Sequence, residues 1–176
     1  REQCVQALEI GIEMAQKCKD DGDQITAVGE MGIGNTTSTA AVTSVLTGYA
    51  PADVTGRGAG LSSDGLARKI SAIEQAIARN RPDPTDPIDV LSKVGGFDIA
   101  GITGFYLGAA ANRMPIVADG VITAAAALCA VRLCPAVRDY IIFSHESKEP
   151  AGKLLLDALH VQPFITAGMR LGEGTG

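Results

Sequence analysis

The feature that most constrains the fold of this chain is a glycine-rich run between an apolar segment and a helix-like segment. Residues 25–28 are mostly apolar, residues 29–39 read GEMGIGNTTST, and residues 40–46 are rich in alanine and valine. This order predicts a strand, a tight turn and a helix. Gly32 and Gly34 allow backbone N–H groups to approach a ligand, and the unpaired donors at a helix N-terminus suit a phosphate.

A turn without a ligand is the alternative interpretation, because the run matches neither G-x-x-x-x-G-K-[ST] nor G-x-G-x-x-G. That mismatch weakens both a nucleoside triphosphatase and a dinucleotide-binding interpretation. Glu30 adds a constraint of its own. A carboxylate repels a phosphate, so Glu30 is expected to bind something neutral or cationic, such as ribose hydroxyls.

Strand-like and helix-like segments alternate along the rest of the chain, and this alternation predicts an open, parallel α/β sheet. The proline-rich residues 80–89 are expected to be irregular, and residues 51–60 to form a second glycine-rich loop. Further helices are expected over residues 3–19, 64–79, 98–112, 121–133 and 151–159, and further strands over 114–118, 140–143 and 163–166.

Ligands bind such sheets beyond the carboxyl ends of the strands. We therefore expect four loops to gather along one edge of the sheet: 29–35, 119–120, 144–149 and 167–174.

Composition excludes several classes of function. The formal net charge of −5 argues against broad nucleic-acid binding, which needs a basic face. The longest apolar run, residues 121–131, is too short to span a bilayer. Four cysteines form no C-x-x-C pair, so they read as reduced thiols of a cytosolic protein rather than as a zinc site. The chain begins at Arg1 and ends on Gly-Thr-Gly, and we expect a single α/β domain, residues 1–176, taken from a longer protein.

Glu173 is the candidate general base. It lies between Gly172 and Gly174, which leave room for a ligand, and Met169 and Leu171 offer apolar surface before it. A carboxylate beside apolar walls tends to have a raised pKa and can act as a base. Capping of a following helix is the alternative role.

Lys69 and His145 are weaker candidates. Lys69 borders the apolar stripe of the helix expected over 64–79, where a lysine either extends its ammonium toward an anion or is a surface residue with a buried stem. His145 follows the strand expected over 140–143. Because the chain has no G-x-S-x-G elbow, we interpret His145 as structural or substrate-lining.

Four motifs, in order along the whole chain, resemble nicotinate-nucleotide:dimethylbenzimidazole phosphoribosyltransferases, which build the lower ligand of cobalamin. The motifs are GEMGIGNTT, PIVADG, SHESKEP and GMRLGEGTG, at residues 29–37, 115–120, 144–150 and 168–176. The resemblance implies a doubly wound, mostly parallel Rossmann-like sheet with helices on both faces, a cytoplasmic homodimer, and no metal or other cofactor. It implies transfer of phosphoribose from nicotinate mononucleotide to dimethylbenzimidazole or a related azole, giving α-ribazole 5′-phosphate and nicotinate.

The same resemblance implies roles for individual residues. Glu173 would be the catalytic base, taking the imidazole proton as the ring nitrogen attacks C1 of ribose. Met169 and Leu171 would line the slot for the base. Phosphate and ribose would be held by Glu30, Gly32, Gly34, Asn35 and Lys69.

The chain departs from the family pattern in two respects. Ala151 stands where the family has a glycine, and the family's N-terminal region is expected to be missing. Two alternatives therefore stay open: a non-catalytic α/β fragment, and another nucleotide- or phosphate-binding α/β enzyme such as a phosphatase or kinase.

Overall fold

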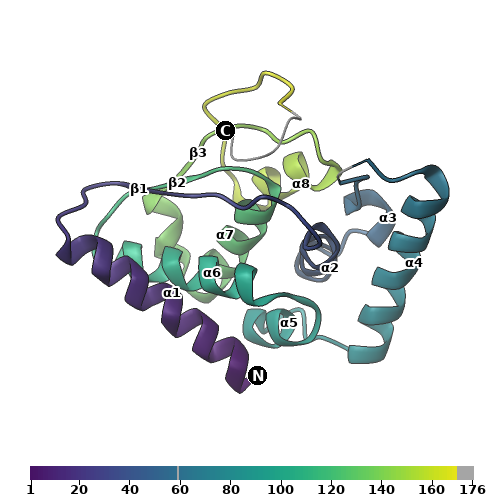
Figure 1. The fold of residues 1–176 in the computed structure, drawn as a ribbon, viewed down its shortest axis with the longest axis horizontal. Helices are drawn as coiled ribbons and strands as arrows, with labels where there is room; N and C mark the ends of the chain where they lie inside the picture. Colours follow the sequence, from purple (N-terminus) through teal and green to yellow (C-terminus); the bar gives the residue numbers. More distant parts are fainter. Residues whose placement is uncertain (59, 170–176) are drawn as a thin grey trace.

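A parallel sheet of strands β1, β2 and β3 organises the computed structural model, which describes residues 1–58 and 60–169. The strands are short: β1 is Thr26–Val28, β2 is Ile116–Ala118 and β3 is Ile141–Phe143. β2 lies in the middle and pairs in parallel with both neighbours. Helices connect the strands (Figure 1). The predicted α/β class and the parallel sheet are confirmed.

The described helices fall close to where the sequence places them, with boundaries explained by local chemistry. Gly48 ends α2 in the left-handed region at φ 79°. The Ser62 hydroxyl caps α4 by accepting a hydrogen bond from the Gly65 amide at 3.1 Å. The helices are α1 Glu2–Asp20, α2 Thr36–Thr47, α3 Pro51–Val54, α4 Ser63–Asn80, α5 Pro87–Val94, α6 Phe97–Ala111, α7 Val121–Leu133, the 3-10 helix η1 Pro135–Tyr140, and α8 Pro150–Leu159.

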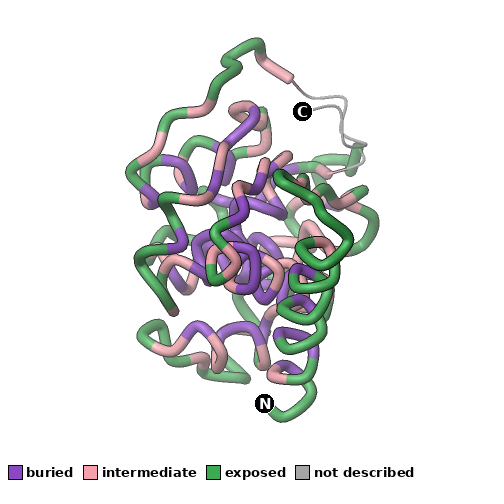
Figure 2. Tube along the Cα trace, turned by 90° about the vertical axis from the view of Figure 1, so that its left-hand side faces the viewer, coloured by how far each residue is buried: buried purple, intermediate pink, exposed green. Residues whose placement is uncertain are grey.

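The alanine-rich helix α7 forms the centre of the core. It is buried from Ile122 to Ala130 and contacts α2, α6, α8 and β2. Small side chains allow these neighbours to approach closely, and Figure 2 shows the buried segments gathered in the middle of the molecule. In the sheet, Ile116, Ala118, Ile141 and Phe143 are buried, whereas the alternate residues Val117 and Ile142 are only half-buried.

α1 crosses α6 at a contact made of glycines. A Cβ placed on Gly104 would overlap the carbonyl oxygen of Leu8, and one placed on Gly11 would overlap the carbonyl oxygen of Gly101. The two helix backbones therefore touch where side chains are absent. The small-residue surface of α6 is used by α1 within the chain.

The proline-rich segment was predicted to be irregular over residues 80–89, and this prediction is wrong at its end. Pro87 begins α5, and the Asp86 carboxylate caps it by accepting from the amides of Ile88 and Asp89 at 3.0 and 3.2 Å. Proline is suited to the first helical position because its missing N–H would have no partner there. The short helix α3, which begins at Pro51, was missed for the same reason.

The strand predicted over residues 163–166 is wrong in extent. Ile165 forms an isolated parallel bridge with His145, and no longer ladder follows in the described part of the chain. The bridge nevertheless holds this segment beside the end of β3. Among the same described residues, no helix combines the length and hydrophobicity needed to cross a membrane.

Candidate functional site

A cavity of about 730 Å³ lies at the carboxyl ends of the strands. It is lined by residues that follow β1, β2 and β3, as expected for an α/β sheet, and by Thr55–Gly58, which the sequence did not assign to this edge. The predicted gathering of loops is confirmed for their described parts. The lining residues are Glu30–Ile33, Thr36, Thr55–Gly58, Leu66, Asp119–Thr123, His145, Ser147–Pro150 and Met169.

The N-termini of α2, α7 and α8 all face this cavity, through Thr36, Val121 and Pro150. Each helix N-terminus carries a partial positive charge and amide groups without a partner inside the helix. An anion in the cavity would therefore be stabilised from several sides at once.

The glycine-rich loop after β1 is closed by one of its own side chains. The Glu30 carboxylate turns back and accepts a hydrogen bond from the Gly32 amide at 2.5 Å. Gly32 and Gly34 have φ values of 80° and 83°, which glycine adopts readily. Glu30 and Gly32 line the cavity, whereas Gly34 does not.

Asn35 lies just before α2, but its side chain turns away from the cavity. Its Nδ2 donates to the Asp98 carboxylate on α6 at 2.6 Å, and its buried Oδ1 has no hydrogen-bond partner among the described residues. Asp98 had no role in the sequence-based interpretation. The contact joins the start of α2 to the start of α6, so Asn35 fixes the position of the α2 N-terminus.

Lys69 extends from α4 to the start of α2. Its ammonium donates to the Thr36 hydroxyl at 2.8 Å and to the Gly56 carbonyl at 3.1 Å. Burial lowers the pKa of Lys69, and the nearby Glu149 carboxylate partly opposes that shift. Since Thr36 and Gly56 both line the cavity, the Lys69 ammonium lies immediately behind its wall.

Gly56 must lack a side chain for this wall to form. A Cβ at Gly56 would overlap the Glu149 carboxylate and lie 2.8 Å from Cδ of Pro150. The loop before α4 therefore packs directly on the start of α8. No local pattern in the sequence indicates this contact, because Gly56 and Glu149 are far apart along the chain.

Asp119 and His145 follow β2 and β3 and occupy the middle of the lining. His145 Nδ1 lies 3.9 Å from Asp119 Oδ1 and 2.9 Å from the Ser144 hydroxyl. The side chains of His145 and Asp119 are 9% and 16% exposed. Both are therefore mostly buried polar groups at the cavity, and neither is a solvated surface residue.

Of the residues proposed to bind the base, Met169 is on the cavity wall, and its carbonyl accepts from the Lys148 amide at 3.2 Å. Leu171 and Glu173 lie outside the described residues. Across residues 1–58 and 60–169, no group of three or more His, Cys, Asp and Glu side chains is arranged to hold a metal ion.

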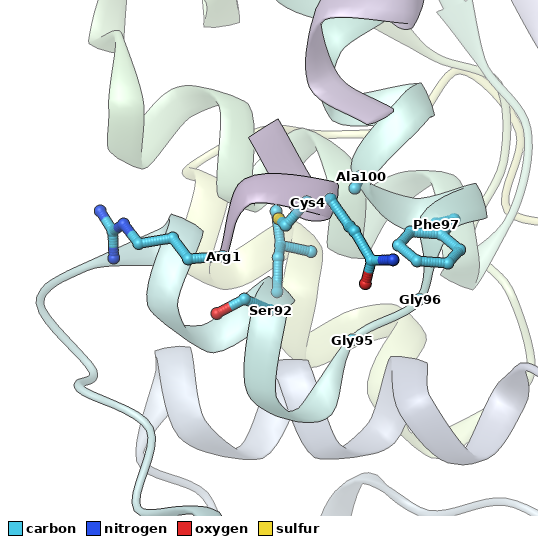
Figure 3. Close-up of a pocket in the computed structure, with 9 residues that line it drawn as sticks. Arg1, Cys4, Ser92, Gly95, Gly96, Phe97 and Ala100 are labelled. Atoms are coloured by element: carbon cyan, nitrogen blue, oxygen red, sulfur yellow. The ribbon is translucent and has the colours of Figure 1, made fainter. Parts of the chain in front are cut away.

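A second, smaller cavity of about 200 Å³ lies between the starts of α1 and α6 and the end of α5 (Figure 3). Its lining includes Arg1, Cys4, Ser92 and Phe97. None of the candidate residues from the sequence faces it, and it is remote from the strand ends. The larger cavity is the candidate functional site.

The fold and this cavity define a class: an α/β protein with a cavity at the carboxyl edge of a parallel sheet, among helix N-termini whose partial charge suits an anion. Comparison with known proteins narrows the class. A family model described as phosphoribosyltransferase matches residues 1–176. The chain belongs to the nicotinate-nucleotide–dimethylbenzimidazole phosphoribosyltransferase family.

Relatives with that name align with this chain over its whole length. The protein from Geobacter metallireducens is 53% identical and that from Roseiflexus sp. is 54% identical, each over 176 residues that make up 100% of this chain and 50% of the relative. The crystal structure of CobT from Thermus thermophilus matches with a TM-score of 0.91 at 39% identity, covering 98% of this chain and 52% of that one. This chain thus spans about half the length of the curated relatives it matches.

Proposed function

We propose that the protein containing this chain transfers phosphoribose from nicotinate mononucleotide to dimethylbenzimidazole, and that the chain supplies the pocket for the nucleotide. The relatives are named for this reaction. The observation that carries the proposal is the contact of Lys69 with Thr36 at the start of α2, on the wall of the cavity. It brings an ammonium group and a helix N-terminus to one place, which suits a phosphate.

The phosphate is proposed to bind in front of Thr36. The first hydrogen bond inside α2 is donated by the Thr39 amide, so the amides of Thr36, Thr37 and Ser38 have no partner within the helix. Because Lys69 already bonds the Thr36 hydroxyl, its ammonium can interact with a phosphate bound there at little conformational cost. Asn35 acts through its backbone position and its bond to Asp98 rather than by touching the ligand.

The ribose is proposed to lie next to the glycine-rich loop, where Glu30 and Gly32 line the cavity. Glu30 is already bonded to the Gly32 amide, which fixes one carboxylate oxygen and leaves the other for hydroxyl groups. Gly34 supports this arrangement through its positive φ rather than through contact with the ligand.

The acceptor base is proposed to lie against Met169 and Leu171, with Glu173 as the general base. Removing the ring proton as the C–N bond forms raises the nucleophilicity of the azole, and such assistance is worth about 10²–10⁴ in rate. In the complete gene product, Glu173→Gln should lower kcat by roughly two orders of magnitude with much less change in azole affinity. Turnover within a few-fold of wild type would exclude Glu173 as the base and make Glu30 the next residue to test.

The test of the nucleotide site is Lys69→Ala in the complete gene product. Calorimetric titration should show weaker binding of nicotinate mononucleotide and nearly unchanged binding of dimethylbenzimidazole. Lys153→Ala is the matched control, because Lys153 is an exposed lysine that pairs with Asp157 on its own helix. Equal loss for both ligands, or no loss, would count against the assignment.

A cytoplasmic homodimer is also part of this proposal and rests on the family resemblance. The glycines of α6 do not support it, because α1 covers them within the chain. Sedimentation of the complete gene product should give a dimer, and a monomer well above micromolar concentration would reject it.

A further inference from the structure

The side chain of His145 is held in a defined position at the cavity, and the function proposed above gives it no role. Its side chain is nine-tenths buried and lies on the cavity lining. The other histidine of the chain, His160, is the exposed residue that ends α8. The two histidines therefore differ in kind, and only His145 faces a ligand-sized space.

The backbone around His145 is held on both sides. The Ser144 amide donates to the Ala118 carbonyl at 3.0 Å, which ties the segment to β2. On the other side, the Ile165 amide donates to Ser144 and the Glu146 amide donates to Ile165, each at 3.0 Å. The imidazole thus projects from a fixed point at the end of β3.

The hydrogen bonds of Ser144 determine which imidazole nitrogen carries a proton. The Ser144 hydroxyl is 3.1 Å from the Asp119 carbonyl oxygen, which can only accept, so the single hydroxyl proton is donated there. The hydroxyl must then accept from His145 Nδ1 at 2.9 Å. Nδ1 is therefore the protonated nitrogen, and Nε2 of the neutral ring is an acceptor.

Nε2 is available to a ligand. None of the residues described in the structure forms a hydrogen bond with it, and the adjacent Cε1 lies 3.9 Å from where a Cβ of Gly120 would be. Gly120 directly precedes α7 and also lines the cavity. The Cε1 side of the ring thus lies beside the start of α7, among residues that line the cavity.

We propose that His145 Nε2 accepts a hydrogen bond from a sugar hydroxyl of the nucleotide, beside the Asp119 carboxylate, and so makes the site selective for ribose. This inference rests on the proposed function. Asp119 Oδ1 lies 3.9 Å from Nδ1 of the same ring, so the carboxylate and the imidazole are neighbours at the ends of adjacent strands. An acceptor at Nε2 can take the proton of one ribose hydroxyl, whereas a phosphate or a nicotinate carboxylate has no proton to donate and is repelled by Asp119.

Paired substitutions test which nitrogen matters. In the complete gene product, His145→Asn keeps an N–H near Nδ1 for Ser144 but removes the acceptor, and His145→Gln places an amide oxygen near Nε2. Calorimetric titration with nicotinate mononucleotide should show about a fivefold to tenfold loss of affinity for the asparagine variant and at most about a twofold loss for the glutamine variant. His160→Asn is the control and should bind like wild type, since asparagine tolerates the left-handed backbone at that position.

Deoxy analogues separate recognition from a structural role. Either the 2′-deoxy or the 3′-deoxy analogue of nicotinate mononucleotide should bind wild type more weakly and lose nothing further in His145→Asn, because the hydroxyl and its acceptor act as a pair. If the asparagine variant lowers affinity for both analogues by the same factor as for the parent nucleotide, His145 does not contact a hydroxyl.

Further outcomes would overturn the proposal. Nitrogen NMR of the imidazole should show Nδ1 protonated and Nε2 bare, and a protonated Nε2 at neutral pH contradicts the acceptor role. Wild-type affinity in His145→Asn would reject the role of His145 while leaving the proposed function intact. Failure of the wild-type protein to bind nicotinate mononucleotide would reject the proposed function and this inference with it.

Discussion

The glycines of the α1–α6 contact and the glycines around the cavity differ in what forbids a side chain. At Gly11 and Gly104 the backbone is helical, and a Cβ would overlap a carbonyl oxygen of the partner helix. At Gly32 and Gly34 the nearest atoms leave room for a Cβ, but φ is 80° and 83°. The first pair is required by packing and the second by backbone conformation.

Gly56 combines features of both regions. It lies in a cavity loop, yet it needs to be glycine because the start of α8 touches it. Its carbonyl accepts from Lys69, so a packing contact positions a proposed ligand-binding group. The cavity wall therefore combines a tightly packed contact at Gly56 with a loop of positive φ at Gly32 and Gly34. Substitutions should act through steric overlap in the first part and through backbone strain in the second.

The largest expected effect is at the helix contact. Gly104→Ala forces α1 away from α6, and we expect a loss of about 3 kcal/mol or more in the free energy of unfolding, at the upper end of what overpacking costs. Thermal unfolding of the complete gene product measures it.

Gly101→Ala is the matched control for that variant. Gly101 lies three residues earlier on the same helix, and a Cβ there would be 3.8 Å from the Ala7 carbonyl, an ordinary contact. Alanine in place of a helical glycine should stabilise by about 0.5–1 kcal/mol. If both variants unfold like wild type, the helices do not touch as described.

The next effect is at Gly56, where packing and ligand binding meet. Gly56→Ala should cost about 1–3 kcal/mol of stability, because the new methyl group meets Glu149 and Pro150. Adding Glu149→Ala removes the closer of these contacts and should restore at least half of the loss. A double variant as unstable as the sum of the single variants would show that Glu149 is not the obstacle.

Much of the fold follows from local patterns in the sequence. Residues 121–133 were predicted as a helix because the run is apolar nearly all round, and α7 has the same limits. Gly48 and Ser62 indicated the end of α2 and the start of α4. Errors came at Pro51 and Pro87, where proline begins a helix instead of interrupting one, and at residues 163–166, where one bridge stands in place of a strand.

The cavity was less predictable than the fold because its contacts join distant parts of the chain. The cap-like residue Asn35 was expected to hold ligand, yet its amide bonds Asp98, 63 positions later. Lys69 reaches Thr36 across 33 positions, and spacing along α4 indicated only that it bordered an apolar stripe. His145 was interpreted as structural or substrate-lining because the chain has no G-x-S-x-G elbow. The hydrogen bonds around its ring, to Ser144 and through it to the Asp119 carbonyl, have no signature in the sequence.

A smaller effect is expected at Gly34, and it separates conformation from space. No atom lies within 4 Å of a Cβ at this position, so any cost comes from the positive φ. Gly34→Ala should lower stability by about 1 kcal/mol, and Gly34→Asn by less, because asparagine visits the left-handed region more readily. Denaturant unfolding compares the two variants. An asparagine variant less stable than the alanine variant would mean that space, as at Gly104, is what matters.

The smallest expected effect is the uptake of protons by Lys69 when the nucleotide binds. The glycines of the α1–α6 contact have no titratable group that could show such an effect. Burial lowers its pKa in the free protein, and a bound phosphate should raise that pKa again. At alkaline pH, where part of Lys69 has lost its proton, nucleotide binding should therefore take up a fraction of a proton. The uptake should vanish well below the lowered pKa, where Lys69 is protonated both with and without ligand.

The pH dependence of stability that Lys69 causes has the opposite sign to that of a lysine whose pKa is raised by an ion pair. Between the lowered pKa of the folded protein and the ordinary value of 10.5, the unfolded chain binds more protons, so Lys69 makes stability rise with pH in that interval. Calorimetry of nucleotide binding in buffers of different ionisation enthalpy measures the proton uptake. Lys69→Met should abolish it and Lys153→Met should leave it unchanged, because Lys153 is exposed and does not line the cavity. If the uptake persists in Lys69→Met, another group takes up the proton, and the proposed interaction of Lys69 with the phosphate is wrong.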